Sequence, residues 1–291
     1  MTRRTATAIG FIAVLLWALL ALFTVGSAPV PPFQLNAMTF AVGGAIGAAW
    51  VTATGGWARL KAIPLRIYAF GTIGLFGYHA LYFSALRLAP PAEAGLIAYL
   101  WPLLIVLFSG LLPGERLRPL HVVGACIAFA GAALLIVPRL TGDGSILGYG
   151  LALLCALTWS SYSVLSRRLG NTPTETVAVF CIATAILSII AHLLFETTSW
   201  PTASVGWISV FALGLGPVGL AFYVWDIGMK RGDIQTLGAA SSAAPLLSTL
   251  MLVIFGLADA RQALLLSAIL ITAGAALAAW ASAQDQRRAP R

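Results

Sequence analysis

Charged residues are scarce in this chain of 291 residues. Asp, Glu, Lys and Arg make up 9% of it, whereas a soluble domain carries about 25%. Apolar residues make up 60%. So few charges do not cover the surface of a soluble protein of this size, and the lipid bilayer therefore has to be the solvent. The apolar runs are continuous over about 20 residues, which favours membrane-spanning helices over the short alternating strands of a barrel.

Metal, nucleotide and catalytic motifs are missing as well. Cys126, Cys155 and Cys181 all fall in apolar segments, without a CxxC or Cys/His spacing, and neither a P-loop nor HExxH occurs. Residues 214–219 match the dinucleotide fingerprint GxGxxG by letter only, because no strand precedes them inside their apolar segment. We therefore predict no cofactor, no metal site and no enzymatic activity. The Gly-rich stretch is interpreted as a flexible or closely packed part of a helix.

Length and breaking residues divide the chain into ten apolar segments, each long enough for a membrane-spanning helix. The connections contain Pro, Gly and charged residues, and none is long enough for a domain outside the membrane. The predicted fold is an all-α polytopic membrane protein with ten transmembrane helices. The segments are 5–27, 32–54, 65–88, 91–112, 119–138, 145–167, 174–195, 205–229, 234–257 and 262–283.

The 17 basic residues are spread one to three at a time between the apolar runs, so they form no nucleic-acid-binding stripe. Their distribution instead predicts topology. Only Arg87, Arg139 and Arg261 fall outside the two termini and every second loop, and such a bias marks the cytoplasmic side. We expect both termini to be cytoplasmic.

The two halves of the chain repeat each other. Pro-Leu-Leu begins at Pro102 and again at Pro245, and Gly-Ala-Ala-Leu begins at Gly131 and again at Gly274, each at an offset of 143 residues (245 − 102 and 274 − 131). Each half holds five apolar segments, so the second copy enters the membrane from the opposite side. We predict two inverted five-helix repeats, residues 1–140 and 141–291, as in many secondary transporters.

Several aromatic residues fall near the middle of the predicted spans instead of at the membrane interfaces. Any one of them fits core packing, whereas the set, drawn from both halves, favours a shared cavity. His79 lies among them and fits a titrating group, a donor to substrate, or a side chain hydrogen-bonded to a backbone carbonyl. The GxxxG of Gly43 and Gly47 indicates close helix packing.

Two prolines and two acids stand out within or beside the spans. Pro102 and Pro245 occupy matching mid-helix positions and predict kinks, either static or acting as hinges. Asp226 fits an i,i+4 ion pair with Lys230 or a role in gating or ion coupling. Glu93, near the start of its helix, is interpreted as a cap.

The chain resembles the drug/metabolite transporter superfamily, in the branch with paired EamA domains. The resemblance rests on the ten spans in two repeats, on the stretch from Tyr82 to Leu104, on Glu115, and on the repeated Gly-Ala-Ala-Leu. Within the family, the Tyr99-Leu-Trp-Pro102 segment is most similar to bacterial exporters of aromatic amino acids. The resemblance implies an inner-membrane exporter with one central cavity and alternating access.

We therefore expect a secondary transporter that exports aromatic and other neutral amino acids and related small metabolites. Its partners would be the substrate and the bilayer, without nucleic acid or an obligatory protein partner. The alternative is broad efflux of drugs and lipophilic cations, with the aromatic cavity as a cation–π cage. The expected hinge or gate residues are Pro102, Pro245, Tyr223 and Asp226. The expected substrate-binding residues are Trp17, Asn36, Tyr78, His79, Tyr82, Tyr99, Trp101, Trp159, Tyr162, Ser163 and Ser242.

Overall fold

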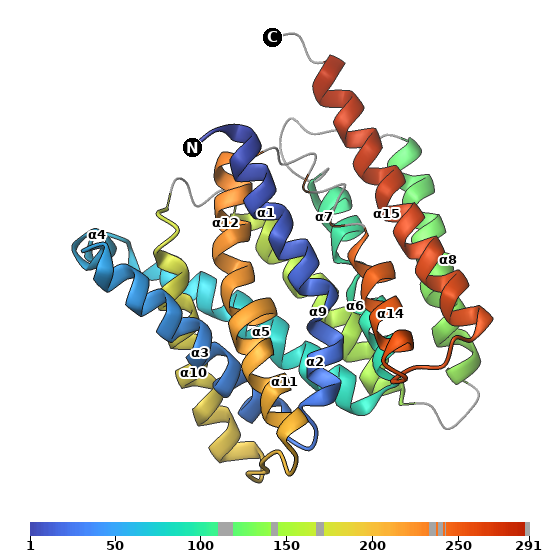
Figure 1. Cartoon of the computed structure of the whole chain (residues 1–291). Helices are drawn as coiled ribbons and strands as arrows, with labels where there is room; N and C mark the ends of the chain where they lie inside the picture. The colour runs from blue at the N-terminus through green and yellow to red at the C-terminus, as the bar shows by residue number, and fades with distance from the viewer. Residues whose placement is uncertain are drawn as a thin grey trace.

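Helices make up every regular element in the described part of the chain, as the all-α prediction requires. The computed structural model describes residues 1–109, 119–140, 145–166, 172–232, 237, 241 and 243–288 (Figure 1). The helices of the first half are α1 (Arg3–Ala18), α2 (Leu20–Gly26), α3 (Pro32–Ala53), α4 (Trp57–Lys61), α5 (Leu65–Leu88), α6 (Pro91–Ala98), α7 (Trp101–Ser109) and α8 (Pro119–Leu140).

The described residues of the second half also form helices. Its single departure from α-helical geometry among the described residues is one π-helical turn, η2, between α11 and α12. The elements are α9 (Ile146–Ser166), α10 (Thr176–Phe195), α11 (Ser204–Leu215), η2 (Gly216–Leu220), α12 (Ala221–Arg231), α14 (Ala244–Ile254) and α15 (Gln262–Arg288).

Five helices of the described chain are long and apolar enough to cross a membrane: Arg3–Gly26, Pro32–Ala53, Ile146–Leu165, Thr176–Phe195 and Ser204–Gly228. Some other predicted segments are interrupted. The segment predicted at 91–112 is divided into α6 and α7, because the helix stops at Tyr99 just before Trp101 and Pro102. Length and composition thus identify a membrane protein.

The two prolines predicted in mid-helix lie at helix starts. Pro102 is the second residue of α7 and Pro245 the second residue of α14. Proline fits the first helical turn, because the amide hydrogen it lacks has no intrahelical acceptor there. Each proline therefore begins a new helix instead of bending a continuous one.

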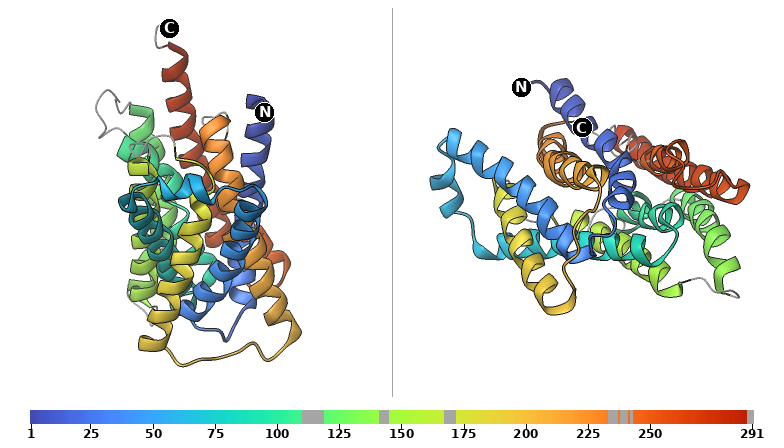
Figure 2. Two further views of the ribbon diagram at one scale, coloured as in Figure 1. Left: turned by 90° about the vertical axis from the view of Figure 1, so that its left-hand side faces the viewer. Right: turned by 60° about the horizontal axis from the view of Figure 1, so that its bottom comes forward.

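Helices from opposite halves form the most extensive contacts. The pairs are α8 with α15, α3 with α10, α5 with α9, and α1 with α12. Figure 2 shows the first two pairs on opposite sides of the molecule, with the others between them. When each helix is replaced by the helix at the same place in the other half, α8–α15 and α3–α10 stay the same pairs. The pair α5–α9 becomes the pair α12–α1. The start of α1 and the end of α15 lie at one end of the bundle, here called the terminal end; the opposite end is the far end.

Glycine allows two helix contacts to be unusually close. A Cβ atom on Gly43 of α3 would lie 2.9 Å from the Cα of Gly219 in η2. A Cβ on Gly124 of α8 would lie 2.6 Å from the carbonyl oxygen of Gly274 in α15. Real side chains do not approach backbone so closely, so the helices meet this way only without one. Close packing at Gly43 and in the 214–219 stretch is thus confirmed.

Polar groups join the two halves at the far end. Glu93 of α6 pairs with Arg261 at 2.9 Å and accepts a hydrogen bond from the Tyr149 hydroxyl of α9. Glu93 lies in the first turn of α6, as its interpretation as a cap requires, and its carboxylate in addition serves the other half of the chain. The Glu196 carboxylate accepts from the backbone N–H groups of Phe33 (2.8 Å) and Gln34 (3.0 Å) at the start of α3. These contacts hold the far end together.

Candidate functional site

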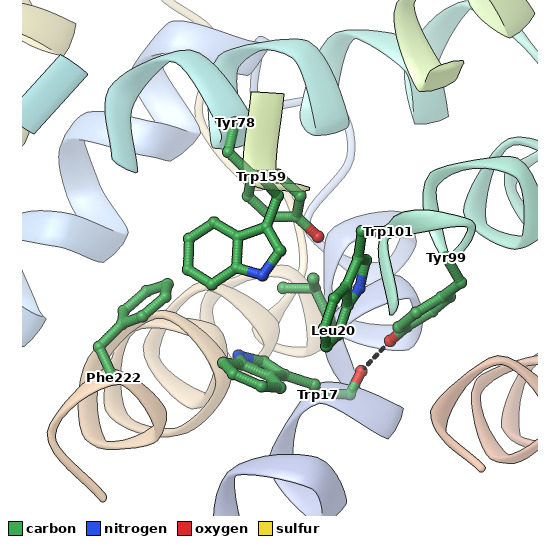
Figure 3. A pocket seen from close by; sticks show the side chains of 7 residues that line it. All are labelled: Trp17, Leu20, Tyr78, Tyr99, Trp101, Trp159 and Phe222. Carbon is green, nitrogen blue, oxygen red and sulfur yellow. Dashed lines mark hydrogen bonds between the residues drawn. The ribbon is translucent and has the colours of Figure 1, made fainter. Parts of the chain in front are cut away.

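An aromatic cavity lies between the two halves of the chain (Figure 3). It holds about 10 Å³, which is room for about one water molecule. It is therefore too small for an aromatic side chain in this conformation. Its lining residues are Trp17, Leu20, Tyr78, Tyr99, Trp101, Trp159 and Phe222.

Three indoles form the centre of the lining. Trp17 of α1 lies 6.2 Å from Trp101 of α7 and 6.3 Å from Trp159 of α9, and Trp101 and Trp159 are 6.5 Å apart. All three pairs meet at 80–82°, the edge-to-face arrangement that the ring quadrupoles favour. Since Trp159 belongs to the second half, the cluster spans both halves.

Phe222 and Tyr78 extend this wall. The Phe222 ring of α12 lies 6.2 Å from Trp17 and 5.9 Å from Trp159. Tyr78 of α5 lies 5.0 Å from Trp159. The wall is thus built by α1, α5, α7, α9 and α12, so a relative movement of the two halves would change its shape.

Two hydrogen bonds fix Trp17. Its indole N–H donates to the carbonyl oxygen of Pro217 at 3.1 Å, and its own carbonyl accepts from the Tyr99 hydroxyl at 2.6 Å (Figure 3). Pro217 lies in η2, and a π turn displaces carbonyl groups from the regular helical ladder, which suits acceptance from a side chain. The Trp17 carbonyl lies in the last turn of α1, where helical carbonyls lack partners within the helix.

The unused polar groups of the lining are few. Within the described residues, the indole N–H groups of Trp101 and Trp159 make no hydrogen bond, so both remain available to a ligand. The lining contains no charged side chain. Such a cavity suits an aromatic or apolar group with a hydrogen-bond acceptor at its edge.

His79 and Tyr82 lie behind the lining on α5. The His79 ring lies 4.8 Å from Phe40 and 5.4 Å from Phe222, and its Nδ1 is 3.0 Å from the Leu75 carbonyl oxygen. Tyr82 stacks on Tyr78 at 6.0 Å. In the part of the chain that is described, neither His79 Nε2 nor the Tyr82 hydroxyl has a hydrogen-bond partner, although both are buried. Both groups are therefore free to form a hydrogen bond, and they lie directly behind the residues that line the cavity.

The remaining predicted residues are placed elsewhere. Tyr162 lies 5.3 Å from Trp159, toward the terminal end of α9, and Ser163 follows it outside the lining. Asn36 lies between α3 and α10, where its Nδ2 donates to Ser188 at 2.9 Å. Ser242 lies outside the described residues.

The predicted gate residues occupy helix contacts. The Tyr223 hydroxyl donates to the Gly43 carbonyl at 3.0 Å and so joins α12 to α3. Asp226 pairs with Lys230 at 2.7 Å and accepts from the Thr174 hydroxyl. The expected i,i+4 ion pair of Asp226 is thus present.

Sequence reasoning missed Leu20 and Phe222 in the lining. Leu20 lies three residues after Trp17, on the same helix side. Phe222 stands beside Tyr223, which the sequence analysis named as a gate residue. Among the described residues, no group of three His, Cys, Asp or Glu side chains is placed to hold a metal ion.

Comparison with known proteins adds a family and close relatives. Residues 5–137 and 146–280 each match the sequence profile of the EamA-like transporter family. The aromatic amino acid exporter YddG of Ancylobacter novellus is 56% identical over 282 residues, which cover 96% of this chain and 98% of that protein. The aromatic amino acid exporter YddG of Escherichia coli is 24% identical over 267 residues, covering 86% and 88%. A solved crystal structure with 55% sequence identity matches with a TM-score of 0.78 over 95% of this chain and 98% of its own.

Proposed function

This chain belongs to the EamA-like transporter family, and from that premise we propose that it exports aromatic and other neutral amino acids across the bacterial inner membrane. The observation that carries the proposal is the cavity of aromatic rings, without charged side chains, between the two halves. A ring-bearing solute gains stacking and edge-to-face contacts there. The names of the two YddG relatives support this class of substrate.

The proposed framework is ten membrane-spanning helices in two inverted repeats, residues 1–140 and 141–291. Two separate family matches, one in each half, support it. So does the packing, because exchange of the halves reproduces the same helix pairs. Inverted repeats place the substrate site at their interface, near the middle of the membrane.

Transport would proceed by alternating access. A cavity of about 10 Å³ has to expand before it holds an amino acid. The break between α6 and α7 and the π turn η2 interrupt two helices that carry lining residues, and interruptions of this kind absorb changes in backbone angle. Pro102 and Pro245, at the starts of α7 and α14, are the proposed hinges. Tyr223, which joins α12 to α3, would take part in the gate.

The binding roles divide into two layers. The rings of Trp17, Tyr78, Tyr99, Trp101 and Trp159 would enclose the substrate ring. As the cavity widens, His79 Nε2 and the Tyr82 hydroxyl would come within reach of the polar groups of the substrate. Both atoms, which are buried without a hydrogen-bond partner, would then gain one. Asn36, Tyr162, Ser163 and Ser242 would contribute from outside this first layer.

The proposal is tested by counterflow. Proteoliposomes preloaded with phenylalanine are expected to accumulate radiolabelled phenylalanine, whereas protein-free liposomes do not. Unlabelled tryptophan and tyrosine should compete. Competition by quaternary ammonium dyes, without competition by amino acids, would replace this proposal with efflux of lipophilic cations.

Both chain ends are expected on the cytoplasmic side. Thr2→Cys and Gln286→Cys, each made in a variant with Cys126, Cys155 and Cys181 replaced by alanine, should react with an impermeant maleimide only in inverted membrane vesicles. Thr202→Cys, in the connection between α10 and α11 at the far end, should react in intact cells. Opposite labelling of the two ends would rule out an even number of crossings and the inverted repeat.

A further inference from the structure

An amino acid carries two charges that the aromatic cavity does not match. The cavity lining has no charged side chain, whereas a free amino acid brings an ammonium and a carboxylate group. Burying either charge without a partner is costly. A transporter for such a substrate, which rests on the function proposed above, therefore needs opposite charges next to the cavity.

Asp226 continues the face of α12 that begins at the cavity. Phe222 and Asp226 are four residues apart, so they lie on one side of the helix with a rise of about 6 Å between them, and Lys230, from the next turn, pairs with Asp226 at 2.7 Å. Phe222 lines the cavity. Other faces of α12 are occupied, since Tyr223 meets α3 and Gly228 meets α1 at Gly10. The ion pair thus lies on the cavity side, one to two turns toward the terminal end.

The side of α12 that carries this ion pair faces α9 and the connection that follows α9. The Phe222 ring lies 5.9 Å from Trp159 of α9, and one turn further along α12 the Asp226 carboxylate accepts from the Thr174 hydroxyl, between α9 and α10. The Asp226 carboxylate therefore lies against protein instead of pointing toward lipid.

The pair is open to a ligand. The side chains of Asp226 and Lys230 are 23% and 29% exposed, whereas that of Glu93 at the far end is 4% exposed. Lys230 and the Thr174 hydroxyl both contact Asp226 through Oδ2. Oδ1 accepts no hydrogen bond from any described residue, so it is free to accept one from a ligand.

We propose that Asp226 and Lys230 form the head-group site for the zwitterionic amino acid. The Asp226 carboxylate binds the ammonium group and the Lys230 ammonium binds the carboxylate, while the substrate ring lies in the widened aromatic cavity beside Phe222. One helical turn, about 6 Å, separates Asp226 from Phe222, which is comparable to the length of an aromatic side chain.

Binding would also loosen the connection between α9 and α10. The Lys230 Nζ donates to the Thr172 carbonyl, and Asp226 accepts from Thr174. A zwitterion that takes over both charges competes with these contacts, and residues 172–175 are then freed from α12. Substrate arrival would thereby be linked to movement at the terminal end.

Three ligands separate the two charges. Phenylalanine carries both, 2-phenylethylamine carries only the ammonium, and 3-phenylpropanoate carries only the carboxylate. Binding of each radiolabelled ligand to the purified full-length protein in detergent would be measured by scintillation proximity. Asp226→Asn should weaken phenylalanine and 2-phenylethylamine about tenfold or more and spare 3-phenylpropanoate, because a charged hydrogen bond is lost. Lys230→Met should weaken phenylalanine and 3-phenylpropanoate and spare 2-phenylethylamine.

The opposite ligand profiles cannot arise from misfolding, which would weaken all three ligands together. Asp259→Asn is the matched control, since it removes an exposed carboxylate from the connection between α14 and α15 at the far end, away from the proposed site. It should leave all three affinities unchanged. Equal changes for all ligands, or none, in the Asp226 and Lys230 variants would overturn the head-group site. If the unaltered protein itself did not bind phenylalanine, the proposed function would fail instead.

Discussion

Replacing Trp101 by alanine is expected to lower phenylalanine counterflow at least tenfold. Trp101 packs edge-to-face against Trp17 and Trp159, and each aromatic pair contributes about 0.5–1.5 kcal/mol beyond the area it buries. Loss of both pairs and of the indole N–H removes more than the ~1.4 kcal/mol that corresponds to a factor of ten. The initial rate of counterflow in proteoliposomes, at equal protein content, measures the effect.

The control for Trp101 is a tryptophan outside the cavity. Trp200 is half-exposed and stacks on Trp207 at 5.9 Å, near the far end. Trp200→Ala should transport at the unaltered rate, and Trp101→Phe should keep part of the activity because a ring remains. Full activity of Trp101→Ala, with a normal elution profile on size exclusion, would remove Trp101 from the substrate site.

Replacing Gly43 by leucine is expected to destabilise the fold strongly. A Cβ there would lie 2.9 Å from the Gly219 Cα, so the backbone of α3 or of η2 has to move to make room for a side chain. Overpacking of this kind costs about 1–3 kcal/mol or more. We expect the midpoint of thermal unfolding in detergent to fall by about 5 °C or more.

Gly150→Leu is the matched control, because a Cβ on Gly150 of α9 would meet no atom within 4 Å. It should leave the unfolding midpoint unchanged or raise it slightly, since leucine favours a helix more than glycine does. An equal loss in both variants would show that leucine destabilises the protein at any helical glycine, and that the contact of α3 with η2 does not decide the result.

The sequence could predict much of the fold because membrane helices are specified locally. The composition required a bilayer, and the family resemblance to paired EamA domains is confirmed by both halves of the chain. The lining aromatics Trp17, Tyr78, Trp101 and Trp159 follow from their depth along the helices, which needs only the rise per residue. Tyr99 belongs to the segment on which the family resemblance rests.

Rotational and long-range placement could not be obtained in this way. Asn36 has suitable depth for the cavity but points to Ser188 between α3 and α10. Glu93 resembles a cap at the start of its helix, yet it pairs with Arg261 far along the chain. Phe222 lines the cavity and its neighbour Tyr223 does not, a difference of about 100° around one helix.

The sequence by itself determined the solvent of this protein, its helical class, its repeated halves and the depth of its aromatic residues. These follow from hydropathy, period and spacing, which act over one helix at a time. The tertiary structure decided which side chains share the cavity, how Gly43 and Gly219 let α3 meet η2, and which charges stand beside the rings. Those features depend on the rotation and contact of helices distant in the chain, and no local pattern specifies either.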